Sequence, residues 1–167
     1  MNNRLMSAVL RRRTALVAVG LAATLMMGGT ALANPAAESV EAVKAAHSDA
    51  VARYALQISD ADPAKRSMVL HVAEHLLKNY GKDKVDIEIV AFGPGIKLLF
   101  AHDNPNTKLI AKLAAEGVRF SACHNALKHM AKVLGHEPAL VPAARIVPAG
   151  IVRVHDLAVA GYFVDKP

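Results

Sequence analysis

The sequence predicts an α/β fold: one domain whose mostly parallel sheet of about five strands carries helices on both faces. From residue 51 onward, short apolar segments alternate about four times with segments of helical periodicity, the pattern of a parallel sheet. The 134 residues that follow position 33 are enough for one domain with a substantial core. The chain has a single cysteine, so the domain depends on its core or its partners rather than on an internal disulfide.

Residues 1–33 have the features of a cleavable secretory signal. Arg4 and Arg11–Arg13 precede the uncharged stretch Thr14–Ala33, which closes with the small-residue motif Ala31-Leu32-Ala33. Twenty uncharged residues could also form an uncleaved anchor, but Gly28-Gly29 and the cleavage motif argue against it. We therefore expect a periplasmic or secreted protein without a stable membrane anchor. The arginine triplet leaves open whether export is general or of the twin-arginine type.

The positive charge of the chain is concentrated in this signal. The whole sequence has a net charge of +6, but four of its 20 Lys and Arg residues and none of its 14 acidic residues lie in residues 1–33. The remainder has 16 basic and 14 acidic residues, a net charge of +2. Such a small net charge gives no reason to expect a nucleic-acid partner.

The mature chain is expected to begin with a leader, residues 34–50, that is either mobile or a short helix. The α/β domain then spans residues 51–167 and opens with a strand over 53–59, where apolar side chains alternate. A helix over 64–80 follows, with Asp62 as its N-cap and Pro63 in its first turn.

The middle of the domain predicts two further strand–helix units. A strand over 85–92 ends at Gly93-Pro94-Gly95, followed by one or two helical turns and a helix over 107–116. A third strand over 118–122 leads directly into Cys123-His124-Asn125 and a helix that ends near Leu134.

The last unit is shorter. Pro138 and Pro142 restrict any strand within 140–147 to a short one. A helix is expected over 151–160, and residues 162–164 fit a final edge strand.

Cys123 is the candidate catalytic residue, because it lies where a strand gives way to the N-terminus of a helix. Unpaired N–H groups and the helix dipole favour a thiolate there, and a thiolate is nucleophilic. His124 and Asn125 are candidate binding residues that could orient the sulfur or a substrate anion. The alternative is a packed, inert cysteine.

Two other motifs in the chain have a possible chemical role. His71, Glu74 and His75 match the H-x-x-E-H pattern of some zinc peptidases, but they lie in an ordinary amphipathic helix with no third ligand placed. We therefore predict no metal and no other cofactor. Gly93 and Gly95 favour a tight strand-to-helix turn, or alternatively bring backbone N–H groups to the Cys123 site.

Three stretches together resemble the DsrE/DsrF-like family, specifically its exported, largely uncharacterised branch. They are Lys84–Ile96 (KVDIEIVAFGPGI), Gly117–Asn125 (GVRFSACHN) and Val147–Tyr162 (VPAGIVRVHDLAVAGY). The resemblance covers about residues 52–166. It implies a compact α/β domain assembled into homo-trimers or hexamers, and relatives that carry sulfane sulfur as a persulfide on a cysteine after the third strand. Cys123 occupies that position, Gly93 and Gly95 match the turn after the second strand, and Asn125 matches a position near the cysteine.

The resulting hypothesis is an exported sulfur-handling protein that accepts sulfane sulfur on Cys123 from a donor and passes it to a partner protein. Whether it is an enzyme in its own right, similar to a sulfurtransferase, is left open. Two rivals are a non-catalytic binding or assembly module with a packed Cys123, and a thiol-redox protein that forms mixed disulfides. The redox role would need a second protein to supply the resolving thiol.

Overall fold

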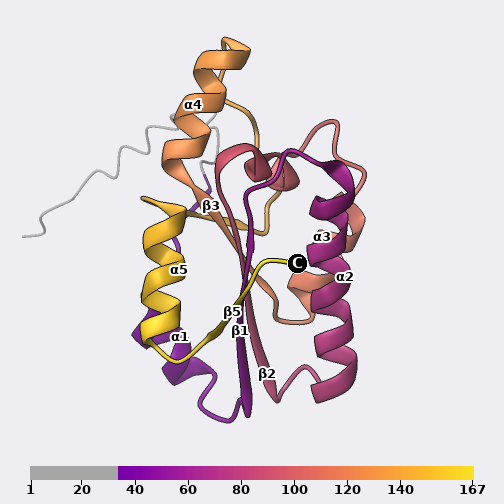
Figure 1. Cartoon of the computed structure of the whole chain (residues 1–167), viewed down its shortest axis with the longest axis vertical. Coiled ribbons are helices and arrows are strands. Elements are labelled where there is room, and N and C mark those ends of the chain that lie inside the picture. The colour runs from indigo at the N-terminus through magenta and orange to yellow at the C-terminus, as the bar shows by residue number, and fades with distance from the viewer. Residues whose placement is uncertain (1–33) are drawn as a thin grey trace, which may run out of the picture. The chain divides into compact units, whose positions relative to one another are not determined.

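The computed structural model describes residues 34–167, so the predicted signal lies outside the described part. It confirms the predicted α/β class: one sheet of five parallel strands in the order β4-β3-β2-β1-β5, with helices packed around it (Figure 1). The strands are β1 (Ala52–Ile58), β2 (Val85–Ala91), β3 (Arg119–Cys123), β4 (Ala144–Val147) and β5 (Phe163–Asp165).

Helices cover both faces of this sheet. The helices α2 and α3 lie on one face and α1 and α5 on the other, while α4 continues from β3 beyond the end of the sheet (Figure 1). The helical elements are α1 (Val40–Ala46), α2 (Pro63–Tyr80), the 3-10 helix η1 (Gly93–Leu99), α3 (Thr107–Ala115), α4 (His124–Leu134) and α5 (Gly150–Val159).

The strand order explains why α5 changes face. The chain moves one strand at a time from β1 to β4, and then returns across the sheet to place β5 beside β1. Strand–helix–strand connections are almost always right-handed, so a reversal of direction puts the helix on the opposite face. Because all five strands are parallel, their carboxyl ends, including that of β3, lie at the same edge of the sheet.

Most of the predicted boundaries agree with the structure to within a residue or two. The Asp62 carboxylate accepts a hydrogen bond from the Ala64 amide at 2.8 Å, as an N-cap does, and α2 ends at Gly81. One difference is η1, which begins at Gly93 itself rather than after the glycine turn and is a 3-10 helix throughout.

The main core lies between the sheet and the α2–α3 face. Leu56 and Ile58 of β1 and Ile87 and Ile89 of β2 pack there against the buried stripe of α2. A smaller apolar cluster, which includes Val40 of α1 and Leu157 of α5, fills the opposite face. The side chains that alternate along the central strand β2 are therefore buried on both faces, as in other sheets covered by helices.

The segment after residue 33 is packed onto the domain, and its short helix is α1. Ala36 forms a parallel bridge with Ile146 of the edge strand β4, through hydrogen bonds from the Ala37 amide to the Ile146 carbonyl and from the Ile146 amide to the Pro35 carbonyl, both 2.9 Å. The side-chain amide of Asn34 donates to the Val141 and Ala144 backbone carbonyls, both at 3.0 Å. This pairing satisfies an edge that would otherwise be open. Within residues 34–167, no helix is both long and apolar enough to cross a membrane.

Candidate functional site

Cys123 is the last residue of β3 and the N-cap residue of α4. Its backbone is extended, with φ −68° and ψ 115°, and its side chain makes no capping hydrogen bond. The Cα atom pairs in register with Val147, the last residue of β4. The residue is 6% exposed, so the thiol is largely shielded from bulk water but lies beside the first turn of an 11-residue helix.

A cavity of about 590 Å³, here called the Cys123 groove, opens next to this cysteine. Its walls come from the residues after β2, from α4 and from the start of α5, all at the carboxyl edge of the sheet. Most of the lining is apolar, including Phe92, Pro94, Met130, Val133 and Ile151. The thiol therefore borders an open groove whose walls are mostly apolar.

The two predicted glycines have different positions. Gly93 lines the groove and has φ +51°, a conformation that favours glycine over other residues. Gly95 is a buried residue of η1 itself, where an added Cβ would lie 2.3 Å from the Ile58 carbonyl oxygen. Gly95 therefore lets η1 approach β1 and does not line the groove. Gly150 has a comparable packing role, since its Cβ would lie 2.7 Å from that of Phe92.

The two polar residues that follow Cys123 also differ in whether they line the groove. Asn125 lines the Cys123 groove, whereas His124 is exposed and is not part of its wall. Consecutive positions on a helix point about 100° apart, and at the start of α4 it is the Asn125 position, not the His124 position, that faces the groove. Of the predicted site residues, Cys123, Asn125 and Gly93 are thus brought together, and His124 and Gly95 are not.

Two basic side chains in the groove wall were not among the predicted site residues. Lys97 of η1 and His129 of α4 both line the groove, and the residues described as lining it include no carboxylate. A negative charge on the sulfur would therefore lie beside a helix N-terminus and near basic rather than acidic residues. His129 lies four residues after Asn125, a spacing that shares one helix face and could have indicated it.

A second polar group, here called the Glu88 cluster, is buried on the α1–α5 face. It comprises Asp86, Glu88, Arg119, Arg153 and Tyr162. The Arg153 guanidinium donates to both Glu88 carboxylate oxygens, from Nε at 2.7 Å and from Nη2 at 2.8 Å. Arg119 and the Tyr162 hydroxyl both donate to Asp86. The cluster thus ties β2 to β3 and to the α5–β5 unit.

Further contacts extend the cluster to neighbouring segments. The Ser121 hydroxyl donates to Glu88 at 2.6 Å, and Arg153 Nη1 donates to the Glu38 carbonyl at 2.8 Å. Burial on its own raises the pKa of Glu88, but the hydrogen bond and charge of Arg153 and the charge of Arg119 outweigh it, so this pKa lies below its ordinary value of 4.5. Burial, and next the hydrogen bond to Asp86, raise the pKa of the Tyr162 phenol well above its ordinary value.

The Glu88 cluster is not among the predicted site residues, although β2 contains a signal for it. Asp86 and Glu88 alternate with apolar residues, which is also the pattern of a strand with one face in water. In a parallel sheet covered on both faces, such carboxylates must be buried and paired. Every residue of β2 is buried, so both carboxylates need the arginine partners that the tertiary structure supplies.

The H-x-x-E-H motif lies on the exposed side of α2. Glu74 accepts hydrogen bonds from Lys112 at 2.9 Å and interacts with His71 Nδ1 at 2.9 Å, which accounts for its two carboxylate oxygens. These contacts lower the pKa of Glu74, with the Lys112 hydrogen bond as the largest cause. In the part of the chain that the structure describes, no three His, Cys, Asp or Glu side chains are grouped to hold a metal ion.

Comparison with known proteins supports the fold and leaves the function to the site. No family model and no curated protein matches the sequence. A solved structure of similar fold is "Protein of Unknown Function MTH1491" from Methanobacterium thermoautotrophicum, with a TM-score of 0.60 and 23% sequence identity. The match covers 70% of this chain and 99% of that chain. Likeness at this level of identity establishes a shared α/β architecture alone.

Proposed function

We propose that this protein is an exported sulfur carrier of the DsrE/DsrF-like type, which holds sulfane sulfur as a persulfide on Cys123 and delivers it to a partner. The observation that carries the proposal is the position of this thiol: it lies at the junction of β3 and α4 and borders a largely apolar groove. All three sequence stretches that resemble the family contribute to this groove: Gly93 comes from the first, Cys123 and Asn125 from the second, and Gly150 and Ile151 from the third.

The transfer step is a displacement at sulfur. The Cys123 thiolate attacks the outer sulfur of a donor persulfide, and a bond forms between Cys123 Sγ and that sulfur as the donor's S–S bond breaks. The electron pair of the broken bond leaves with the donor thiolate, which then takes a proton from water. Transfer to an acceptor thiol follows the same displacement, with Cys123 as the leaving group, so no external oxidant or reductant is needed.

The groove supplies three conditions that favour this step. The α4 N-terminus stabilises the attacking thiolate and, after transfer, the persulfide anion. Lys97 and His129 add positive or hydrogen-bonding character to the wall, and Asn125 can donate through its amide. The apolar lining offers water few hydrogen-bond partners beside the sulfur.

Mass spectrometry of the purified mature protein tests the proposal. After incubation with a polysulfide donor, each folded chain is expected to gain the mass of one sulfur atom and to lose it on treatment with a thiol reductant. If the folded protein gains no sulfur, and iodoacetamide modifies Cys123 only after denaturation, the thiol is a packed core residue. The non-catalytic binding module would then be the better description, whereas mixed disulfides without sulfur gain would favour the redox role.

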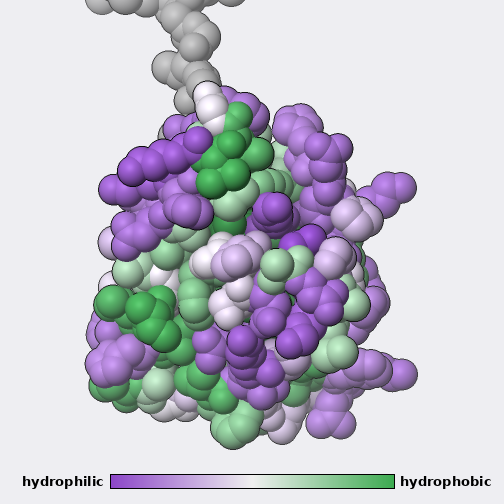
Figure 2. Space-filling view, turned by 45° about the horizontal axis from the view of Figure 1, so that its top comes forward, coloured by the Kyte–Doolittle hydropathy of each residue, from purple (hydrophilic) through white to green (hydrophobic). Residues whose placement is uncertain are grey.

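The family resemblance also leads us to propose a homo-oligomer, a trimer or a hexamer. Val133 of α4 and Ile151 and Val152 of α5 are 65%, 60% and 54% exposed around the Cys123 groove, and burial of such side chains favours association. In the view of Figure 2 hydrophobic groups alternate with hydrophilic ones, which is compatible with several limited contact areas. Light scattering of the mature protein at micromolar concentration should give three times the mass of one chain or a multiple of it; a monomer would contradict this assembly.

Export is proposed from the secretory features of residues 1–33. Protein recovered from the periplasm is expected to start at Asn34, as judged by N-terminal sequencing or intact mass. Asn34 already holds the domain through its two hydrogen bonds to Val141 and Ala144, so cleavage before it leaves these contacts intact. Intact Met1 in a membrane fraction would show that the segment is retained as an anchor.

A further inference from the structure

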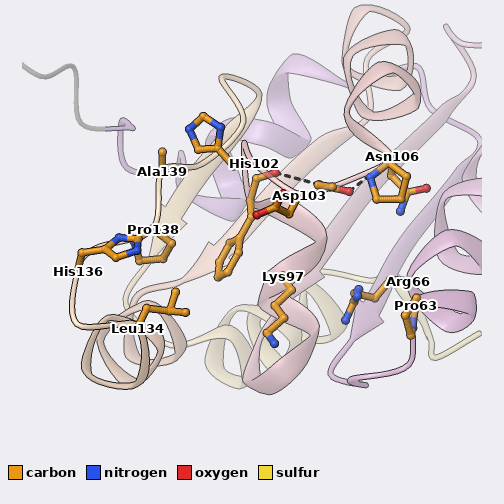
Figure 3. Close-up of a pocket in the computed structure, with 13 residues that line it drawn as sticks. Pro63, Arg66, Lys97, His102, Asp103, Asn106, Leu134, His136, Pro138 and Ala139 are labelled. Atoms are coloured by element: carbon orange, nitrogen blue, oxygen red, sulfur yellow. Dashed lines mark hydrogen bonds between the residues drawn. The ribbon is translucent and has the colours of Figure 1, made fainter.

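A second cavity, of about 430 Å³, lies apart from Cys123 and is here called the cationic cavity (Figure 3). Its walls are formed by the first turns of α2, by η1, by the loop between η1 and α3, and by the segment that follows α4. The volume is within the range of small-molecule binding sites. It has no part in the sulfur-transfer step proposed above, apart from the side chain of Lys97, which lines both cavities.

Four basic side chains from four different segments line this cavity. They are Arg66 of α2, Lys97 of η1, His102 of the following loop and His136 after α4, and all four are drawn around the cavity in Figure 3. Asp103 is the one acidic residue that lines it. With neutral histidines the lining therefore has a net positive charge.

The two permanent cations lack carboxylate partners. Within residues 34–167, no Asp or Glu oxygen lies within 4.0 Å of the Arg66 guanidinium or the Lys97 ammonium, whereas the neighbouring Lys65 pairs with Asp60 at 3.2 Å. Arg66 Nη1 donates to the Ala61 carbonyl at 2.6 Å, which orients the guanidinium but does not neutralise it. Both side chains therefore retain charge and donors for an anionic ligand.

The rest of the lining is apolar and the loop is held in place. Phe100, Leu134 and Pro138 contribute apolar surface to the cavity. The side-chain amide nitrogen of Asn104 donates to the Leu98 and Phe100 carbonyls at 2.6 and 2.9 Å. Its side-chain oxygen accepts a hydrogen bond from the backbone N–H of Asn106 at 3.0 Å. These bonds fix the loop that carries His102, so the cavity is formed without a ligand and little ordering is needed on binding.

We propose that the cationic cavity binds a small organic anion, a molecule with an apolar body and one carboxylate, sulfonate or phosphate group. The anionic group pairs with Arg66 and Lys97, and the apolar body packs on Phe100, Leu134 and Pro138. A mixed lining of this kind selects against bare inorganic anions, which cannot use the apolar wall, and against neutral molecules, which leave the two cations unpaired.

Fluorine NMR with para-fluorobenzoate as the probe tests this site on the full mature protein. Saturable binding is expected, and the neutral isostere para-fluorobenzamide should bind about tenfold more weakly or worse. Arg66→Gln and Lys97→Gln should each weaken benzoate binding by about tenfold, because each removes a charge-assisted hydrogen bond. Lys108→Gln, which removes a charge from the exposed start of α3 outside the cavity, serves as the matched control and should change affinity less than about twofold.

Four results would overturn the proposal. Absence of saturable benzoate binding, or equal binding of the benzamide, would show that the cavity does not select anions. Equal weakening by Lys108→Gln would reduce the effect to the overall charge of the surface. Weakening by Lys97→Gln but not by Arg66→Gln would assign the probe to the Cys123 groove, because Lys97 lines both cavities whereas Arg66 lines the cationic cavity and not the groove.

Discussion

Replacement of Cys123 by serine is expected to abolish sulfur uptake from a polysulfide donor, with no gain of mass in the folded protein. Cys123 is the single thiol of the chain, and a serine hydroxyl cannot form a persulfide at neutral pH. Serine is nearly isosteric and is a good N-cap residue, so α4 should retain its start. Circular dichroism and the oligomeric mass are therefore expected to match those of the native protein, which makes loss of uptake a chemical effect.

Substitutions next to the cysteine should distinguish positioning from mere proximity. Asn125→Ala removes an amide from the groove wall and is expected to slow sulfur transfer about threefold to tenfold, in line with the loss of one hydrogen bond. His124→Ala, one residue closer in sequence but outside the groove, should leave the rate within about twofold. The rate of single-turnover sulfur gain measures both, and the opposite ranking would mean that His124 acts on the thiol.

The largest effect on stability is expected from Glu88→Ala. This change leaves the Arg153 guanidinium buried without its bidentate partner, since both Glu88 oxygens bind it and the arginine is 8% exposed. Removing one member of a buried ion pair costs about 3–5 kcal/mol of unfolding free energy. That is a large fraction of the roughly 5–15 kcal/mol that holds a domain of this size together.

Urea denaturation measures this cost, and Glu74→Ala is the matched control. Glu74 also pairs with a cation, Lys112 at 2.9 Å, but at the surface, where such a pair contributes about 1 kcal/mol or less. Glu88→Gln keeps the shape of the side chain and loses only its charge, so it gives a measurable value if the alanine variant does not fold. Equal losses for Glu74→Ala and the Glu88 variants would show that the buried cluster has no special role.

The same cluster predicts how stability changes with acid. The pKa of Glu88 is lower in the folded protein than its ordinary value of 4.5, so the unfolded chain takes up the proton first as the pH falls. The contribution of Glu88 is therefore complete above about pH 4.5 and is lost as the pH falls through the lower, folded-state pKa. Glu88→Gln should flatten this part of the stability profile, which equilibrium unfolding at successive pH values measures.

The two cavities near the carboxyl edge are connected through one side chain. Lys97 belongs to the wall of the Cys123 groove and to that of the cationic cavity. Its place on a 3-10 helix stiffens the backbone between the two, and Gly95 permits that helix to sit directly against β1. The turn after β2 is thus a shared support of both cavities.

The order and type of the elements could be predicted from local patterns along the chain. Apolar alternation located the first three strands, Asp62 and Gly81 bounded α2, and Cys123 was expected at the strand–helix junction where it lies. These features depend on neighbours a few residues apart, such as the N-cap bond from Ala64 to Asp62 at 2.8 Å. Local hydrogen bonding and periodicity are properties of a short segment, so they can be predicted without knowledge of the fold.

The tertiary structure alone decided which residues share a site. The strand order β4-β3-β2-β1-β5 brings α5 beside β2, and so places Arg153 against Glu88, 65 positions earlier in the chain. It also sets η1 between the two cavities and turns Asn125, rather than His124, into the Cys123 groove. Such pairings depend on long-range packing and on compensation of buried charge, which no short segment specifies. The sequence therefore located the thiol, and the three-dimensional packing selected its neighbours.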